Sequence, residues 1–360
     1  MIPTTRPLLF AALAALIFLL PCSAQYKYVT LQPTSDLPND GTVSTWTHAL
    51  NNSNQVAGYE VDPTGNHFVV VWTNAAPEKR ELPSGYVFEF SGIEINDSGQ
   101  VLTNLQLGGP AGANAAVLWT GSTPAILPPG PNPCAGPGLA ANYAIDLNNL
   151  GHVLGKTAAS GCTTYWIWDG KTFHIIQPPT PPACTPTPFS AVAINNKDEV
   201  LGMQSPPACS AGPLPVVVRA DGSFAFYVAP PAGVTVSYVT SINDLDEVSG
   251  GGSGPAHAAV ALFWQSASAT PSVIHSPNPS QGGTAPGRLN NIGEFILTAQ
   301  NNAGQFPYVW NSGKAMFLAP RGIVIPSSGG GIDDVGKIAV SGLIGGSFNW
   351  SRGLWIVPIP

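Results

Sequence analysis

Short apolar stretches separated by polar turns run along the whole chain, and residues 190–194 and 199–202 are two examples. These stretches are rich in β-branched residues and too short for helices, so the pattern predicts β-strands. One turn phrase recurs seven times between two such strands: an aliphatic residue, Asn or Asp twice, a spacer, a turn residue, a polar residue and an apolar residue. Its copies cover residues 50–56, 95–101, 147–153, 194–200, 242–248, 289–295 and 332–338.

The spacing of this phrase indicates a repeat protein. Its first Asn (Asp333 in the last copy) recurs after 45, 52, 47, 48, 47 and 43 residues, a period typical of repeat architectures. Within each repeat we expect four strands: one before the phrase, one after it, a third that ends in Trp and a fourth closed by Pro. The third-strand tryptophans are Trp72, Trp119, Trp168, Trp264, Trp310 and Trp355, and the fourth repeat has none.

The two ends of the chain favour a closed ring over an open solenoid. A single four-stranded unit cannot bury both faces, so it must pack against its neighbours. Residues 28–33 have the features of a fourth strand without a repeat, whereas the seventh repeat has no fourth strand before Pro360. The sequence therefore predicts an all-β, seven-bladed β-propeller of four-stranded antiparallel blades, closed by the N-terminal strand in the last blade.

The predicted repeats form one domain, residues 25–360. They cover about residues 44–85, 86–130, 138–180, 187–232, 234–280, 282–322 and 327–360, with residues 26–33 completing the last blade. Residues 1–24 have the features of a signal peptide, because Arg6 precedes an apolar run and small residues precede Gln25. The alternative is a lipoprotein acylated at Cys22, although Pro21 fits that motif poorly. We expect a secreted or cell-surface protein in either case.

Composition narrows the classes of partner. The chain has 40 Gly and 37 Pro, only 9% charged residues and a formal net charge of -7. Nucleic-acid binding needs clustered Lys and Arg to displace counterions, so this balance argues against it. The sequence contains no basic amphipathic stretch of the kind that binds membrane surfaces. We expect a monomer without a transmembrane segment in the mature chain.

Four cysteines follow the predicted cleavage site, and an even number in an exported chain indicates disulfides. Cys162 and Cys209 each lie 14 residues after the first Asn of their phrase, while Cys134 and Cys184 precede theirs by 14 and 11 residues. This register favours the pairs Cys134–Cys162 and Cys184–Cys209. A zinc site is the alternative, but no spacing matches the Cys-x-x-Cys of common metal sites.

The phrases are also candidate calcium ligands, since oxygen atoms suit this cation. Most copies hold one carboxylate or none, and their side chains are consecutive instead of alternating as in an EF-hand loop. Residues 243–247 and 333–334 are the most acidic copies. We interpret the phrases as turns and predict no cofactor.

Motifs of catalysis are absent from the sequence, including Gly-x-Ser-x-Gly, His-Glu-x-x-His and phosphate loops. A propeller can still bring acids from several blades together at its axis. Glu89 and Glu94 lie on a predicted first strand beside the channel, in the main acidic group of Asp36, Asp40, Glu60, Asp62, Glu89 and Glu94. A glycoside hydrolase or lyase is therefore the enzymatic alternative. A solvated strand face explains the same acids without catalysis.

Binding is the leading functional hypothesis. The variable segments before the first strands and between the second and third strands share one face of the predicted ring, opposite the Asn turns; we call this the loop face. Loops on a rigid scaffold often carry binding sites. Trp46, Trp166 and Trp350 are out of register with the third-strand tryptophans and are candidate contacts for a sugar or peptide. We therefore predict a non-enzymatic protein that binds a protein or glycan through the loop face; a purely structural envelope repeat protein is the third interpretation.

The repeated phrase and the downstream Trp resemble the HAF repeats of secreted bacterial proteins. The resemblance covers roughly residues 26–360 and is strongest at residues 147–170 and 194–202. It implies an extracellular β-propeller and supplies no catalytic residues. The chain departs from the pattern where the fourth repeat lacks Trp and where Asn54 and Asp198 replace the turn Gly.

Overall fold

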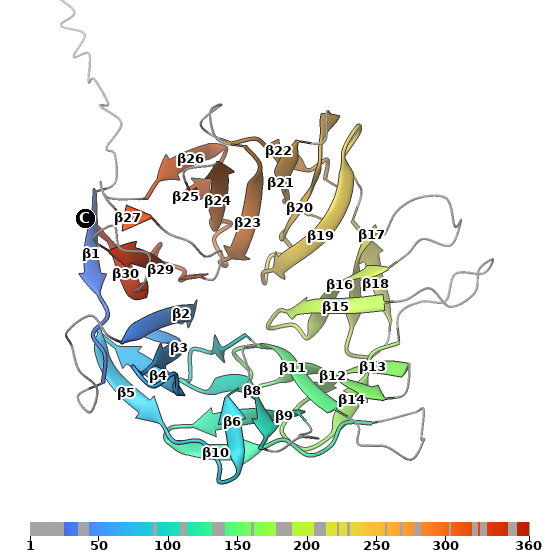
Figure 1. Cartoon of the computed structure of the whole chain (residues 1–360). Coiled ribbons are helices and arrows are strands. Elements are labelled where there is room, and N and C mark those ends of the chain that lie inside the picture. The colour runs from blue at the N-terminus through green and yellow to red at the C-terminus, as the bar shows by residue number, and fades with distance from the viewer. Residues whose placement is uncertain are drawn as a thin grey trace, which may run out of the picture.

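The protein is a ring of seven antiparallel sheets (Figure 1). The computed structural model describes residues 25–34, 43–88, 92–108, 114–131, 141–159, 162–177, 189–204, 214–221, 223–228, 231–255, 258–266, 269–276, 282–301, 304–318, 323–324, 330–344 and 351–359. Over these residues the regular elements are all strands, and the sheets form the blades of a propeller. The predicted all-β, seven-bladed β-propeller is confirmed.

Five blades contain four strands in chain order. The first consists of β2 (Ser44–Leu50), β3 (Gln55–Val61), β4 (His67–Thr73) and β5 (Ala76–Arg80). The third consists of β11 (Ala141–Leu147), β12 (Val153–Ala159), β13 (Cys162–Trp168) and β14 (Phe173–Ile175), and the fourth of β15 (Phe189–Ile194), β16 (Glu199–Gln204), β17 (Leu214–Arg219) and β18 (Phe224–Tyr227). The fifth consists of β19 (Thr235–Ile242), β20 (Val248–Ser253), β21 (Ala259–Trp264) and β22 (Ser272–Ile274), and the sixth of β23 (Thr284–Leu289), β24 (Phe295–Asn301), β25 (Gly304–Asn311) and β26 (Lys314–Phe317).

The second and seventh blades have a first strand in two pieces. In the second blade, β6 (Tyr86–Phe88) and β7 (Glu94–Ile95) both pair with β8 (Val101–Leu107), which is followed by β9 (Asn114–Thr120) and β10 (Thr123–Ile126). In the seventh, β27 (Ile323–Val324) and β28 (Gly331–Ile332) both pair with β29 (Ile338–Ile344), which is followed by β30 (Ser351–Ile359) and β1 (Gln25–Thr30). Among the described residues, the first strand is interrupted in these two blades and continuous in the other five.

The N-terminal strand closes the ring as predicted. β1 pairs antiparallel with β30, from Gln25 opposite Ile359 to Thr30 opposite Leu354 (Figure 1). The chain then crosses to the first blade, where Trp72 donates its indole N–H to the Gln32 carbonyl at 2.7 Å. The Glu60 carboxylate accepts hydrogen bonds from the backbone N–H and hydroxyl of Thr34 at 2.9 and 2.8 Å. These contacts tie the closing segment to the first blade, and they give Glu60 a structural role.

Four tryptophans of the series pack between neighbouring blades. Trp72, Trp119 and Trp264 are fully buried, Trp310 is 6% exposed, and Val218 takes the equivalent position of the fourth blade. In the seventh blade Ile356 pairs with Ile338, so the predicted register of Trp355 is wrong by one residue. The third blade differs from the prediction, because Trp168 is in register but only half-buried. There the core is filled by Trp166, which is fully buried and donates its indole N–H to the Thr157 hydroxyl at 2.9 Å.

Gly155 makes room for Trp166 to fill the core of the third blade in place of Trp168. A Cβ atom at Gly155 would lie 2.2 Å from the Trp166 ring, a distance that no packed pair of carbon atoms tolerates. We therefore expect Gly155→Ala to displace the ring and lower the free energy of unfolding by about 1–3 kcal/mol. Thermal unfolding of the purified variant measures this loss.

The matched control is Gly254→Ala. A Cβ atom at Gly254 would have its nearest neighbour at 3.5 Å, which is ordinary contact. This control should unfold like the wild type. Equal stability of the two variants would contradict the packing of Trp166 against Gly155.

Candidate functional site

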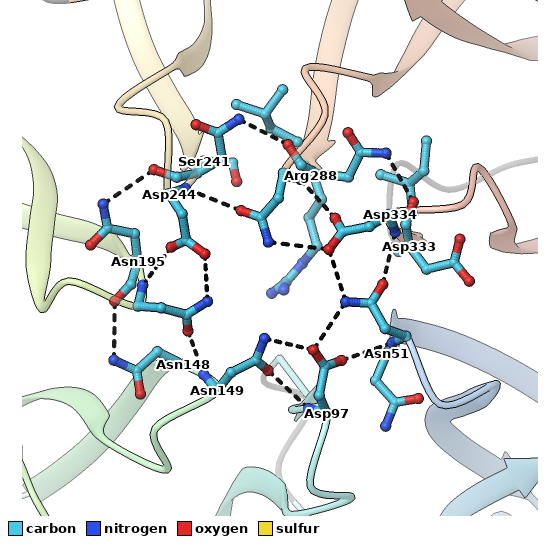
Figure 2. A pocket seen from close by; sticks show the side chains of 18 of the residues that line it. Asn51, Asp97, Asn148, Asn149, Asn195, Ser241, Asp244, Arg288, Asp333 and Asp334 are labelled. Carbon is cyan, nitrogen blue, oxygen red and sulfur yellow. Dashed lines mark hydrogen bonds between the residues drawn. The ribbon is translucent and has the colours of Figure 1, made fainter.

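The seven Asn turns surround an opening on the axis of the ring (Figure 2). A cavity of about 140 Å³ lies there, lined by the first and second Asn or Asp of the turns and, deeper, by Asp146, Ser241 and Arg288. We call this side of the ring the Asn-turn face. It lies opposite the loop face, because each turn joins the first two strands of its blade.

The first Asn of each turn holds its own turn and the next blade together. The Asn51 Oδ1 atom accepts the backbone N–H groups of Ser53 and Gln55 at 3.0 and 2.9 Å. Its Nδ2 group donates to the Asn96 carbonyl of the second blade at 2.8 Å. The same cross-blade bond recurs around the ring, from Asn96 to Asn148, Asn148 to Asn195, Asn195 to Asn243, Asn243 to Asn290 and Asn290 to Asp333. The predicted turn role is thus only half of what this Asn does.

The seventh link of this inner ring is the exception. Asp333 has no side-chain N–H to donate toward Asn51, and its Oδ2 atom is buried without a hydrogen-bond partner among the described residues. Lys337 Nζ lies 3.8 Å from that oxygen. Burial raises the pKa of Asp333 above its ordinary value, against the backbone N–H groups and the Lys337 charge that lower it. The ring therefore has one imperfect junction, between the last blade and the first.

The second Asn or Asp of each turn forms an outer ring without a gap. Each backbone N–H at this position donates to the Oδ1 atom of the next blade's second residue, at 2.7 to 3.1 Å. The order around the ring is Asn52, Asp97, Asn149, Asn196, Asp244, Asn291 and Asp334. No two aspartates are neighbours, and amide groups separate the carboxylates: Asp97 Oδ2 accepts from Asn52 and Asn149 at 3.0 and 2.7 Å. This arrangement gives a rigid opening that carries three carboxylates.

Three charged side chains lie at the position two residues before the first Asn. This position, near the inner end of each first strand, is small in four blades (Ala49, Ala193, Ser241, Gly331) and charged in three (Glu94, Asp146, Arg288). Arg288 forms an ion pair with Glu94, and the same nitrogen lies 3.9 Å from Asp146 Oδ1. Figure 2 shows the Arg288 side chain inside the ring of turns. Small residues elsewhere at this position leave space for the cluster.

One guanidinium charge serves two buried carboxyl groups. Burial raises the pKa of Glu94 to about 8; the Asp146 charge adds to this, and Arg288 opposes it. Burial also raises the pKa of Asp146, against the Arg288 charge and backbone N–H groups that lower it. Burial lowers the pKa of Arg288, but the two carboxylates more than offset it and raise the pKa above its ordinary value. We infer that the cluster keeps a cationic Arg288 and a proton on Glu94 at neutral pH.

An aromatic group lies on the other side of this cluster, between the first and second blades. The Trp46 and Tyr59 rings stack at 6.1 Å, and Phe88 approaches Tyr59 at 5.3 Å. His67 stacks on Phe88 at 5.9 Å. All four rings are half-buried. Because His67 begins β4 just after the β3–β4 connection, this group lies toward the loop face; we call it the aromatic group.

His48 connects the aromatic group to the charged cluster. Its ring lies 5.6 Å from the Tyr59 ring. Burial lowers the pKa of His48 to about 4, and the Arg288 charge acts in the same direction. His48 is therefore neutral at neutral pH and adds no charge to the axis.

The structure places the predicted site residues in different surroundings. Trp46 belongs to the aromatic group, whereas the full burial of Trp166 removes it from the candidate ligand contacts. Cys162 begins β13. The other predicted residues, namely Cys134, Cys184, Cys209, Trp350, Glu89, Asp36 and Asp40, lie outside the described residues. The two disulfide pairs thus stay predictions.

The acids named from sequence divide in the same way. Glu94 reaches the axis as expected, but Asp62 closes an exposed turn by accepting the backbone N–H groups of Thr64 and Asn66 at 2.8 and 2.9 Å. Asp146 and Arg288 were not among the predicted residues. Their signal was the repeat register, since each occupies the same place in its repeat as Glu94.

The chemistry available at the axis is acid–base and ionic. Within the described part of the chain, no three His, Cys, Asp or Glu side chains are grouped so as to hold a metal ion. No described helix has the length and apolar character needed to span a membrane. The channel offers a protonated carboxyl group, a guanidinium and an amide-lined opening.

Comparison with known proteins supports the fold alone. No protein-family model matches the chain, and none of the curated proteins does, so membership of the HAF-repeat family is not confirmed. The β-propeller domain of the Trilobed protease from Pyrococcus furiosus is similar with a TM-score of 0.58 at 11% identity, over 87% of this chain and 93% of that one. That domain is described as having an open velcro topology, whereas here β1 and β30 close the ring.

Enzymes are also among the similar structures. One of two prolyl endopeptidases studied for inter-domain dynamics matches with a TM-score of 0.54 at 12% identity, over 78% of this chain. This chain spans only 42% of that protein. An ulvan lyase, a polysaccharide lyase, matches at a TM-score of 0.48 and 9% identity over 92% of this chain and 96% of that one, too low to carry an argument. At these identities the likeness shows a shared propeller and no shared activity.

The open junction at Asp333 gives a test of the inner ring. We expect Asp333→Asn to add the seventh cross-blade hydrogen bond and to remove a buried, unsatisfied oxygen. The free energy of unfolding should rise by about 1 kcal/mol. The reverse change, Asn290→Asp, should lower it by about 1–3 kcal/mol because it breaks an existing link. Thermal or chemical unfolding measures both; a loss of stability in Asp333→Asn would contradict this account.

The raised pKa of Glu94 predicts a pH dependence of stability. Between about pH 4.5 and 8 the folded protein keeps a proton on Glu94 that the unfolded chain releases, so stability falls as pH rises through this window. Neutral His48 acts oppositely, but only between about pH 4 and 6.5. From pH 6.5 to 8 we therefore expect a loss of up to about 1.4 kcal/mol per pH unit, which Glu94→Gln removes.

Chemical unfolding at several pH values measures this slope. Asp62→Asn is the control, because hydrogen bonds to its carboxylate outweigh desolvation and lower the pKa of Asp62 to about 2, far below this window. Its slope from pH 6.5 to 8 should equal that of the wild type. An unchanged slope in Glu94→Gln would show that Glu94 is already ionised in the folded protein.

Proposed function

We propose that this chain is a secreted or cell-surface binding protein that holds a glycan on the loop-face side of its axis, without catalysis. The observation that supports this most strongly is the aromatic group of Trp46, Tyr59, His67 and Phe88. Its rings are half-buried and held against one another by innermost and neighbouring strands. Sugar rings stack on such faces, and the strands fix the geometry in advance.

The surroundings of the aromatic group also favour a neutral ligand. His48 is uncharged at neutral pH, and Arg288 lies against the carboxyl groups of Glu94 and Asp146. A neutral or weakly charged glycan can therefore approach these rings without having to displace an ion pair. A peptide with aromatic or proline residues is the alternative ligand that we propose for the same site.

An enzyme that acts on polysaccharide is the second candidate function, and one observation favours it. A carboxyl group whose pKa is raised to about 8, as that of Glu94 is, suits the role of a general acid. Both Glu94 and Asp146, however, contact the Arg288 guanidinium, so neither is free to face a substrate. Binding is thus the simpler account of the axis.

Trp46→Ala tests the proposed binding function. A panel of soluble polysaccharides and a glycan array should identify a ligand of the mature wild-type protein, and calorimetry should measure its affinity. We expect the alanine variant to lose about tenfold or more in affinity, because a stacking ring contributes on the order of 1–2 kcal/mol. Trp46→Phe should retain most of the affinity.

The control is Phe317→Ala, which removes an exposed ring from the outer strand of the sixth blade. It should bind like the wild type. Equal affinity of Trp46→Ala and wild type would contradict the proposed site. Turnover of any polysaccharide that stops in Glu94→Gln would favour the enzyme.

A further inference from the structure

Four aliphatic side chains stand exposed on the Asn-turn face, each at the fourth residue of its turn phrase. They are Leu150, Leu245, Ile292 and Val335, with 58%, 60%, 56% and 64% of their surfaces exposed. The same position is Ser53, Ser98 and Lys197 in the other blades, so the turn itself does not require an apolar residue. Exposed aliphatic residues at a position that accepts Ser or Lys call for an explanation outside the fold.

Three of these side chains lie on consecutive blades. Leu245, Ile292 and Val335 belong to the fifth, sixth and seventh blades, whose turns are joined by hydrogen bonds from Asp244 N to Asn291 Oδ1 and from Asn291 N to Asp334 Oδ1. We call these three residues the aliphatic arc. Each arc residue directly follows a residue that lines the axial opening: Asp244, Asn291 or Asp334.

The arc is held rigidly before any partner binds. The backbone N–H of each arc residue donates to the first Asn or Asp of its own turn, at 3.0 Å for Leu245, 3.2 Å for Ile292 and 3.1 Å for Val335. A surface fixed in this way loses little conformational entropy when it is covered. Three exposed aliphatic side chains on such a frame suit a protein contact.

The charge around the arc decides the character of the partner. The seven phrases carry two lysines, Lys197 and Lys337, against nine carboxylates: Asp97, Asp198, Glu199, Asp244, Asp246, Glu247, Glu294, Asp333 and Asp334. Lys197 is paired with Asp246 at 2.6 Å. The opening itself carries Asp97, Asp244 and Asp334, whose hydrogen-bond donors are neutral amide and backbone N–H groups. The cation in the same cavity, Arg288, lies against Glu94 and Asp146. The face is thus acidic with an apolar border.

We propose that the Asn-turn face is a docking surface for a segment of another protein that places a Lys or Arg side chain at the axial opening and aliphatic side chains on the arc. Charge complementarity selects the basic residue, and the arc selects its apolar neighbours. A second copy of this chain would bring two acidic faces together, and an anionic membrane would be repelled. Glycan would leave the arc uncovered.

This docking surface is independent of the proposed glycan site, because the two lie on opposite faces of the ring. A protein with both would connect a glycan on one side to a basic protein segment on the other. The rigid ring would keep the two ligands at a fixed separation.

Selection from a random peptide library displayed on phage tests the proposal. The full mature chain is immobilised, and enriched peptides are synthesised and titrated by fluorescence anisotropy at low and high salt. We expect enriched sequences to combine Lys or Arg with aliphatic residues and to bind more weakly at high salt. The variant Leu245→Ser/Ile292→Ser/Val335→Ser should bind these peptides with an affinity at least about tenfold lower than that of the wild type.

Two controls separate this result from loss of folding and from the glycan site. The variant Ile126→Ser/Ile175→Ser/Phe317→Ser removes three aliphatic or aromatic side chains of similar exposure from outer strands. It and Trp46→Ala should bind the peptides like the wild type. Because these readouts use the opposite face, failure of glycan binding would leave this test unaffected.

Three results would overturn the proposal. Enrichment of acidic peptides, or of none, would show that the charge argument is wrong. Light scattering that finds a wild-type dimer and a monomeric arc variant would identify a second copy as the occupant. Binding to phosphatidylcholine vesicles that the arc variant loses would identify a lipid surface instead.

Discussion

The hydrogen bonds that run from blade to blade around the axis are the interaction on which the structure depends. Each first-position Asn uses its oxygen on its own turn and its amide N–H on the next blade, while the second-position residues form a complete outer ring. A buried amide must satisfy both ends. Asn does so here by joining two blades, which explains why this residue recurs at one place in the repeat. Asp333 is the exception, because a carboxylate accepts hydrogen bonds from its own turn but has no N–H group to donate to the next blade.

This ring determines what the axis can contain. Because the turns are held at fixed spacing, the innermost strands leave a narrow channel, and most repeats place a small residue there. Three repeats place Glu94, Asp146 and Arg288 instead, and the two acids share one guanidinium. Buried charges persist only when they are paired or neutralised. The pairing with Arg288 and the raised pKa of Glu94 therefore follow from geometry imposed by the hydrogen-bonded turns.

The repeat register shows how far sequence reasoning reaches within a blade. Val153 pairs with Trp168 as the register predicts, but the side chain that fills the third blade's core is Trp166. The local signal was Gly155, which leaves space under the ring. Strand pairing follows from the pattern of the repeat, whereas the choice between two neighbouring tryptophans depends on volumes that only packed blades define. The contact between Asp146 and Arg288 could not be predicted for a related reason. The two residues belong to the third and sixth blades, which approach each other only at the axis of the closed ring.

The sequence by itself determined the strands, the sevenfold repeat and the closure of the ring by residues near the N-terminus, because these follow from local turn chemistry and from the count of repeating units. It also indicated that Glu94 would reach the axis and that Trp46 lies outside the core series. Only the tertiary structure decided that the turns bond across blades, that one arginine lies against two acids from other blades, and that exposed aliphatic side chains of consecutive blades lie near an acidic opening. These features join residues far apart in the chain, and their distances exist only once seven blades have closed into a ring.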